Sequence, residues 1–236
     1  MERQLPANKI ALHALHISKT GGSAVSYALR GQIVSGAVIW HHHGVRLRDV
    51  PAGTPVCFFL RHPMTRFISA FHSRRRGGRP RYDVPWKDSE AVVFRLFATP
   101  NDLAEALSAS DSAARNAALA AMSVIERVHP RYSHWFMGAA EVMARRDAIM
   151  LIGLQETLLV DFDRLRRLLG IQDKVALPDD PTLAHRGPPG EHRSLSQRGM
   201  QNVAEHYADD IAFYAQMCDL RAELMATSGA ARSARP

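Results

Sequence analysis

One stretch near the start of the chain, Ala11–Ser26 (ALHALHISKTGGSAVS), constrains the fold more than any other part of the sequence. Its first half is an apolar run with partial alternation, which is typical of a buried β-strand. The adjacent glycines Gly21 and Gly22 allow positive φ angles and bring backbone N–H groups close to a ligand. A helix that begins near Ser23 would add further N–H groups, and Lys19 would add a positive charge. The stretch therefore predicts a strand, a tight turn and a helix that together bind an anion, most naturally a phosphate.

The turn differs from the phosphate-binding loop of Walker A type. That loop has the pattern G-x-x-x-x-G-K-[ST], with the lysine after the second glycine. Here Lys19 precedes both glycines, and no glycine lies four residues upstream of them. An ordinary strand-to-helix turn with a surface lysine is therefore the alternative interpretation of this stretch taken alone.

Further apolar segments alternate with helical patterns along the chain. Strands are expected at Ala37–Trp40, Val56–Leu60 and Ala148–Gly153, and a break at Gly31–Gly36. Helices are expected at Ser23–Leu29, Pro63–Ser73, Asp111–Val128, 138–147 and Leu158–Leu169, and from Ser196 to Met217 or beyond. This alternation predicts an α/β fold in three layers, a parallel sheet flanked by helices. We expect one domain over residues 1–226 and a disordered tail over 227–236.

Composition bounds the environment and the partners of the chain. The 236 residues carry a formal net charge of +7, which favours an anionic partner. The two cysteines, Cys57 and Cys218, cannot form a disulfide framework, so a reducing compartment is the default. The sequence has neither a signal-peptide pattern nor an apolar run long enough for a membrane-spanning helix. We therefore expect a cytoplasmic protein without an integral membrane segment.

Polar side chains follow three of the predicted strands at the point where each strand ends. The first strand leads into Lys19–Ser23, the second into His41–His43 and the third into Arg61, with Ser69 farther along the next helix. Ligands of parallel sheets bind beyond the carboxyl ends of the strands. If these strands are neighbours, the three groups converge on one crevice and supply an anion cradle, a cation with a hydroxyl, and a base.

Two motifs in this order resemble those of the sulfotransferases that use 3′-phosphoadenosine 5′-phosphosulfate (PAPS). HISKTGGS (16–23) is similar to their H-x-P-K-T-G-G-T loop, and LRHPMTRFISAF (60–71) is similar to their R-D-P-x-x-R-x-x-S segment. The histidine run followed by VRLRDVP resembles the G-H segment of carbohydrate sulfotransferases of the uronyl 2-O type and their bacterial relatives. QETLLVDFDRLRRLLG (155–170) is similar to the E-x-L-x-x-D-x-x-x-L segment of these proteins, in which Glu156 and Asp161 are expected to cap or brace a helix. The resemblance covers residues 10–73 and 148–170.

Three positions depart from the family pattern. Ser18 stands where the family has proline, which loosens the turn, and Ser23-Ala24 replaces a common Thr-Ser pair. His62 stands where the family has an aspartate whose role is mainly structural. None of these changes removes a group that the chemistry requires.

The resemblance implies a P-loop-like sulfotransferase fold and a role for each motif. The enzyme would transfer the sulfuryl group of PAPS in line to a hydroxyl of an acceptor, a carbohydrate such as a glycan or glycoconjugate, without a metal. Backbone N–H groups would hold the 5′-phosphate at Thr20, Gly21, Gly22 and Ser23. Lys19 would stabilise charge on the bridging oxygen, and Arg61 and Ser69 would bind the 3′-phosphate.

The resemblance also indicates a base and a cover for the nucleotide. His43 is the first choice for the base and His41 the second, because histidine titrates in the useful range. The loop His185–Ser194 would cover the nucleotide, with Arg186 and Ser194 as further cofactor-binding residues.

Several alternatives remain open for these residues. Arg61 could be a structural ion-pair partner and Ser69 a packed helix residue, while His41–His43 could hold a metal, although neighbouring strand residues point to opposite faces. The basic residues of Arg74–Arg81 could bind nucleic acid, but we favour a border of the acceptor site or a solvated surface, so no nucleic-acid partner is expected.

Two functions of other classes compete with a sulfotransferase. The first is a small-molecule kinase with an unusual phosphate loop, which needs a magnesium-binding aspartate at a strand end; none is obvious in the sequence. The second is a non-enzymatic basic module that binds nucleic acid or an acidic polysaccharide. The module predicts an affinity that falls steeply with salt and no preference for a 3′-phosphonucleotide.

Overall fold

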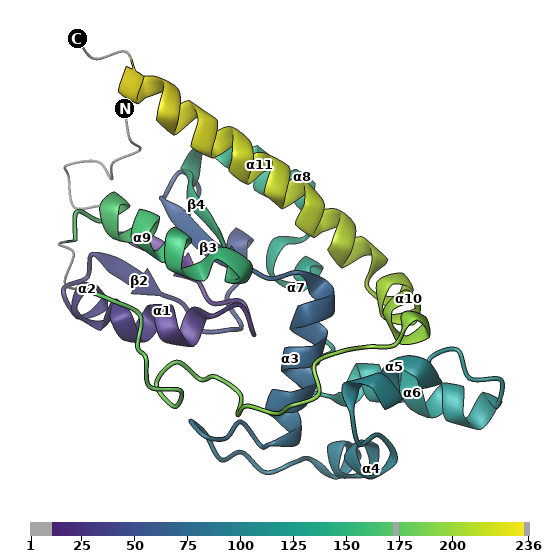
Figure 1. Cartoon of the computed structure of the whole chain (residues 1–236). Coiled ribbons are helices and arrows are strands. Elements are labelled where there is room, and N and C mark those ends of the chain that lie inside the picture. Colours follow the sequence, from purple (N-terminus) through teal and green to yellow (C-terminus); the bar gives the residue numbers. More distant parts are fainter. Residues whose placement is uncertain (1–10, 172–174, 234–236) are drawn as a thin grey trace. The chain divides into compact units, whose positions relative to one another are not determined.

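The computed structural model describes residues 11–171 and 175–233, with side chains as far as residue 226. The chain groups into two compact units (Figure 1). Unit 1 comprises Met1–Arg61, Tyr132–Asp179 and Ala212–Pro236, and unit 2 comprises His62–Arg131 and Asp180–Ile211. The single domain expected over residues 1–226 stays a prediction.

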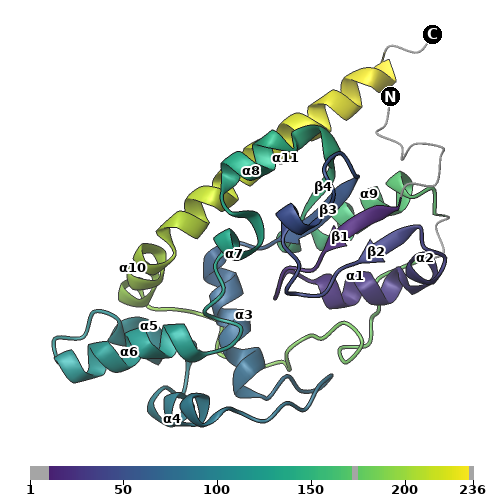
Figure 2. The same ribbon diagram turned by 180° about the vertical axis from the view of Figure 1, so that it is seen from behind.

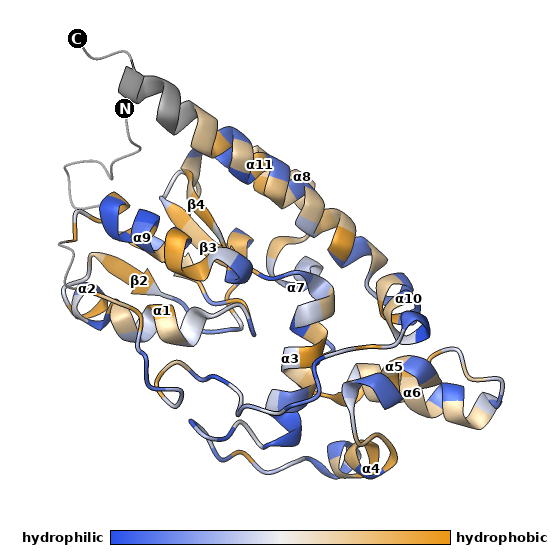
Figure 3. Ribbon diagram, viewed as in Figure 1, coloured by the Kyte–Doolittle hydropathy of each residue, from blue (hydrophilic) through white to orange (hydrophobic). Residues whose placement is uncertain are grey.

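Unit 1 is built on a four-stranded parallel sheet with the strand order β2-β1-β3-β4. The strands are β1 (Leu12–Leu15), β2 (Val38–Trp40), β3 (Val56–Leu60) and β4 (Ile149–Leu154). Every residue of the inner strand β3 is buried, as a strand covered on both faces requires, and the edge strand β4 is also strongly apolar (Figure 3). All four predicted strands are therefore confirmed, as is the predicted α/β class with a parallel sheet.

Helices cover both faces of this sheet, so unit 1 has three layers (Figures 1 and 2). On one face lie α1 (Gly22–Ala28), α2 (Arg30–Val34) and α9 (Leu158–Leu168), whose buried Val25 and Phe162 pack with Cys57 and Phe59. The other face is covered by α7 (Tyr132–Phe136), α8 (Ala139–Ala144) and the later part of α11 (Ala208–Ser233). Single 3₁₀ turns lie at η1 (Leu47–Asp49), η2 (Arg146–Ala148) and η3 (Gln155–Thr157).

Unit 2 is helical. Its elements are α3 (Pro63–Arg75), α4 (Asp88–Leu96), α5 (Pro100–Ala106), α6 (Ser112–Val124), α10 (Gln197–His206) and the first residues of α11. Buried apolar residues of these helices form one core, which includes Phe67, Phe71, Phe94, Leu103, Met122 and Val203. Side-chain oxygens cap three of the helices, because Thr99, Asp111 and Ser196 each accept a hydrogen bond from the first turn that follows.

Two helical predictions were wrong in detail. The break expected at Gly31–Gly36 is instead α2, because buried Leu29 and partly buried Ile33 lie one turn apart against the core. The single helix expected from Ser196 to Met217 or beyond is divided at Tyr207 into α10 and α11. At this point the carbonyl of His206 accepts a hydrogen bond from the Arg131 guanidinium.

The C-terminal helix continues past Met217, as the sequence pattern allowed. The backbone of α11 is helical as far as Ser233, within the segment 227–236 that was expected to be disordered. Residues 234–236 of that segment lie outside the described residues. In the described part of the chain, no helix combines the length and the apolar character that crossing a membrane would need.

Candidate functional site

Three of the predicted site segments follow neighbouring strands of unit 1. β1 lies between β2 and β3, parallel to both, so the turn after β1 lies between the histidine run after β2 and Arg61 after β3. Parallel strands place their carboxyl ends at one edge of the sheet, where ligands of such sheets bind. Lys19, His43 and Arg61 therefore follow the carboxyl ends of three adjacent strands at this edge.

The remaining predicted residues belong to unit 2. Ser69 is half-buried on α3, and Arg186 and Ser194 are exposed in the irregular segment between Asp180 and Ser196. The Ser194 hydroxyl lies 3.4 Å from His192 Nε2. These three residues stay predictions for nucleotide binding.

The turn after β1 has a left-handed backbone at two positions. Gly21 has φ of 88°, as expected for a glycine turn, and Lys19 has φ of 67°. A lysine seldom adopts this conformation, and such residues are enriched where the surrounding structure holds a functional loop in one shape. The buried Thr20 contributes to that shape by donating a hydrogen bond from its hydroxyl to the Ile17 carbonyl at 3.0 Å.

Gly22 has a different role from the one that the sequence suggested. It is the first residue of α1 and does not have a positive φ. A Cβ atom at this position would lie 2.4 Å from His16 Cδ2, far inside van der Waals contact. Gly22 is therefore required because the His16 ring packs directly on the backbone of the turn.

His16 also contacts the predicted base. The His16 and His43 rings lie 3.9 Å apart between centroids and are tilted by 32°. His43 Nδ1 lies 2.8 Å from the His16 carbonyl oxygen, and Trp135 Nε1 donates a hydrogen bond to the His43 carbonyl at 2.8 Å. The backbone and the ring of His43 are thus both held in place next to the turn.

His41, the second choice for the base, makes a different contact. Its Nε2 lies 3.0 Å from Nδ1 of His13 on β1, and the two rings are 5.0 Å apart. Burial lowers the pKa of both imidazoles, and the charges of His13 and His42 lower the pKa of His41 further. The structure therefore pairs His41 with a strand residue and His43 with the turn.

The histidine run shows no metal cluster in the part of the chain that the structure describes. No group of three or more His, Cys, Asp or Glu side chains is placed there to hold a metal ion.

Arg61 is anchored through its backbone by a buried tyrosine. Its N–H donates a hydrogen bond to the Tyr132 hydroxyl oxygen at 3.0 Å, and the same hydroxyl donates to the Arg61 carbonyl. No sequence pattern pointed to Tyr132, which lies 71 residues away in the sequence, in a stretch where no helix was expected.

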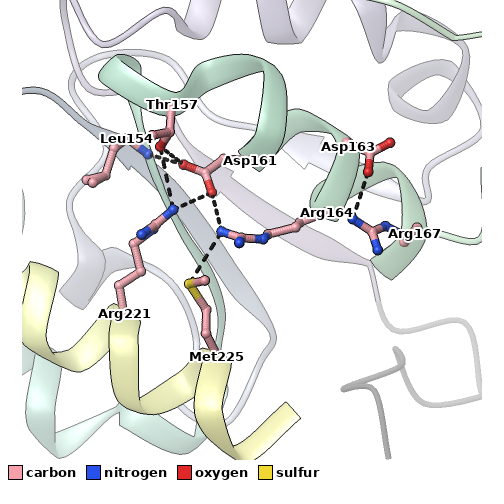
Figure 4. A network of polar contacts seen from close by, with 8 residues as sticks. All are labelled: Leu154, Thr157, Asp161, Asp163, Arg164, Arg167, Arg221 and Met225. Atoms are coloured by element: carbon pink, nitrogen blue, oxygen red, sulfur yellow. Dashed lines mark hydrogen bonds and ion pairs between the residues drawn. The ribbon is translucent and has the colours of Figure 1, made fainter. Parts of the chain in front are cut away.

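Asp161 organises the end of β4, as expected for a bracing residue (Figure 4). Its buried carboxylate accepts hydrogen bonds from the Leu154 N–H at 2.9 Å and the Thr157 hydroxyl at 2.6 Å. The guanidinium groups of Arg164 and Arg221 donate to its other oxygen at 2.9 and 2.7 Å. Asp161 therefore ties β4, η3, α9 and α11 together, and α9 in turn places Leu158 against Gly21.

The basic residues of the Arg74–Arg81 segment are mostly engaged within unit 2. Arg74 is buried, and its Nε donates to the fully buried Glu90 at 2.6 Å, so it is a core ion pair and neither solvated nor part of an acceptor border. Arg76 pairs with Glu191, and Arg81 donates to the Leu183 carbonyl at 2.6 Å. These contacts attach the segment 180–196 to α3 and the loop that follows it.

Comparison with known proteins adds no relative. No protein-family model, no curated protein and no solved structure matches the chain.

Proposed function

We propose that this protein is a sulfotransferase that moves the sulfuryl group of PAPS to a hydroxyl group, with a carbohydrate as the acceptor. The observation that carries the proposal is the order of groups at one edge of the unit 1 sheet. A left-handed lysine turn lies between a histidine that is fixed by that turn and an arginine that is fixed by a buried tyrosine. The sequence resemblance assigns 5′-phosphosulfate, base and 3′-phosphate to these three segments in the same order.

The donor set of the turn fits a phosphosulfate. Backbone N–H groups of residues 20–23 would hold the 5′-phosphate, and Gly21 permits the chain reversal that brings them together. The Lys19 ammonium would stabilise the negative charge that develops on the oxygen between phosphorus and sulfur as the S–O bond breaks. Electrostatic stabilisation of developing charge is usually the largest single contribution to catalysis.

His43 is suited to accept the proton of the acceptor hydroxyl. Its Nδ1 must carry a hydrogen to bond the His16 carbonyl, so the lone pair of the neutral ring is on Nε2. In the transfer, the acceptor oxygen would form a bond to sulfur while the bond from sulfur to the bridging oxygen breaks. The hydroxyl proton would pass to Nε2 of His43, and 3′,5′-ADP would leave with the electron pair of the broken bond.

Arg61 would bind the 3′-phosphate through its guanidinium. Ser69 belongs to unit 2 and stays a prediction for this phosphate. A sulfotransferase of the P-loop-like type is consistent with the parallel sheet of unit 1. We also propose a cytoplasmic location, which is consistent with two cysteines that are not paired in a disulfide.

A thermal-shift comparison of nucleotides tests the proposal. Stabilisation by 3′,5′-ADP without a metal, and much less by 5′-AMP, is the expected result, because a ligand at about one hundred times its dissociation constant stabilises by roughly 2.7 kcal/mol. Stabilisation only by ATP with magnesium would indicate a kinase instead. If no nucleotide shifts the melting temperature, a non-enzymatic basic binding module becomes the better account.

A further inference from the structure

The contact between Tyr132 and Arg61 joins the end of a strand to a fully buried ring. Arg61 is the first residue beyond the paired part of β3, whose last register pair is Leu60 with Leu154. Tyr132 begins α7, and its ring is wholly buried against Phe213, at 5.4 Å, and Phe136, at 6.5 Å. Its hydroxyl accepts the Arg61 N–H and donates to the Arg61 carbonyl.

This double contact restrains Arg61 more strongly than a single hydrogen bond does. A phenol hydroxyl can accept and donate at the same time, and here both functions are used by one residue. The two peptide groups that flank the Arg61 Cα are thereby held, so the direction in which its side chain leaves the backbone is held as well. Because aromatic packing fixes the Tyr132 ring, the hydroxyl is a rigid reference point.

We infer that Tyr132 is a positioning residue that acts through Arg61 on the recognition of a 3′-phosphate. The inference rests on the proposed function, which assigns the 3′-phosphate to the Arg61 guanidinium. Tyr132 contributes no group to the ligand in this account. Its role is to hold the arginine backbone so that the side chain reaches one phosphate position and no other.

A purely structural role is the competing explanation. Arg61 ends the first segment of unit 1 and Tyr132 begins the second. Their contact therefore joins two segments of unit 1 that are far apart in the sequence. If the contact is only structural, its loss lowers the stability of the protein without changing which nucleotide is preferred. The two roles therefore differ in one measurable quantity, the ratio of the dissociation constants for 5′-AMP and 3′,5′-ADP.

The experiment measures this ratio by calorimetry for the full-length wild type and for Tyr132→Phe, which keeps the ring and removes the hydroxyl. We expect the ratio to fall about tenfold in Tyr132→Phe, with the 5′-AMP affinity unchanged, the order expected when a buried polar contact is lost. Tyr207→Phe is the matched control. Tyr207 is equally buried, and its hydroxyl donates to the Val128 carbonyl at 2.8 Å in unit 2, so its removal is expected to lower stability and leave the ratio unchanged.

A double-mutant cycle then tests whether Tyr132 acts through Arg61. In an Arg61→Ala background the guanidinium is absent, so adding Tyr132→Phe is expected to cause no further change in the ratio. An additional loss in that background would show that Tyr132 affects the 3′-phosphate by another route, and would overturn the inference.

The remaining outcomes are also decisive. If the wild type does not prefer 3′,5′-ADP over 5′-AMP, the proposed function itself fails and the inference fails with it. If the wild type has the preference and Tyr132→Phe keeps it, only the inference fails.

Should Tyr132→Phe not fold, a measurement of hydrogen exchange at the Arg61 amide of the wild type replaces the variant. Slowing by 3′,5′-ADP but not by 5′-AMP supports the inference, and equal slowing by both overturns it.

Discussion

His43 Nδ1 lies 2.8 Å from the backbone oxygen of His16, and this contact determines which nitrogen of the His43 ring is basic. A carbonyl oxygen only accepts, so Nδ1 carries the hydrogen and the lone pair of the neutral ring lies on Nε2. The His16 ring packs on His43 and also on Gly22 in the turn after β1. One residue therefore links the proposed base to the proposed anion site.

Replacement of His43 by alanine is expected to reduce sulfuryl transfer by about 10²–10⁴-fold, the usual contribution of a general base. The readout is the release of 3′,5′-ADP from PAPS in the presence of a panel of oligosaccharide acceptors. His41→Ala is the matched control, because His41 contacts His13 and not the turn, and it is expected to keep most of the activity. Full activity in His43→Ala, or loss confined to His41→Ala, would assign the base elsewhere.

Gly22→Ala is expected to destabilise the protein by about 1–3 kcal/mol, the cost of forcing an extra carbon into a packed site. The new Cβ would meet His16 Cδ2 at 2.4 Å and push the ring away from the turn. Gly31→Ala in α2 is the control, since a Cβ there meets nothing within 4 Å and replaces glycine in a helix. Urea denaturation should show Gly31→Ala to be more stable than the wild type by roughly 0.4–1 kcal/mol. Equal stability of the two variants would contradict the proposed role of the His16 contact.

Sequence patterns predicted the sheet of unit 1 better than the details of the site. The apolar runs at β3 and β4 indicated buried strands because burial on both faces leaves a continuous signature. The contacts of His16 and Tyr132 could not be predicted, since they depend on which residues distant in sequence meet at the strand ends. The positive φ of Lys19 was not predicted either, because among the residue types it is glycine that indicates this conformation in a sequence.

Charge patterns were similarly ambiguous. Arg74 looks like its neighbours in a basic segment, yet among the arginines of that segment only Arg74 is buried, because Glu90 on α4 provides a buried carboxylate. By contrast, the bracing role of Asp161 could be predicted, because its position in the motif places it in the first turn of α9, next to the strand end.

Asp161→Asn is expected to destabilise the protein by about 3–5 kcal/mol, because it leaves two guanidinium groups beside a neutral, buried amide. Arg164 and Arg221 both donate to this carboxylate (Figure 4). Asp163→Asn is the control: Asp163 also pairs with two arginines, Arg166 and Arg167, but its side chain is 42% exposed, and pairs that solvent reaches contribute little. Thermal and chemical denaturation of both variants provide the comparison, and similar losses in the two would contradict the bracing role.

His206 is expected to make stability depend on pH in the mildly acidic range. Burial, and then the nearby charge of Arg131, lowers the pKa of this imidazole from 6.5 to about 4 in the folded protein. Between these two values the unfolded chain binds a proton that the folded chain does not, so stability falls as the pH decreases from 6.5 towards 4. Melting temperatures measured across this range should fall less steeply for His206→Gln than for the wild type. Parallel curves would show that His206 does not carry this dependence.

Lys19→Gly is expected to separate stability from function at the turn. A left-handed backbone costs an L-residue roughly 1–2 kcal/mol, and glycine adopts the φ of 67° without that cost, so the variant should be more stable than the wild type. Removal of the ammonium should nevertheless abolish sulfuryl transfer, because no other group takes its place in the proposed mechanism. Met137→Gly relieves a similar φ of 58° at an exposed position and is expected to stabilise the protein without affecting transfer. Urea denaturation and 3′,5′-ADP release from PAPS measure the two effects, and a Lys19→Gly protein that retains transfer would remove Lys19 from the mechanism.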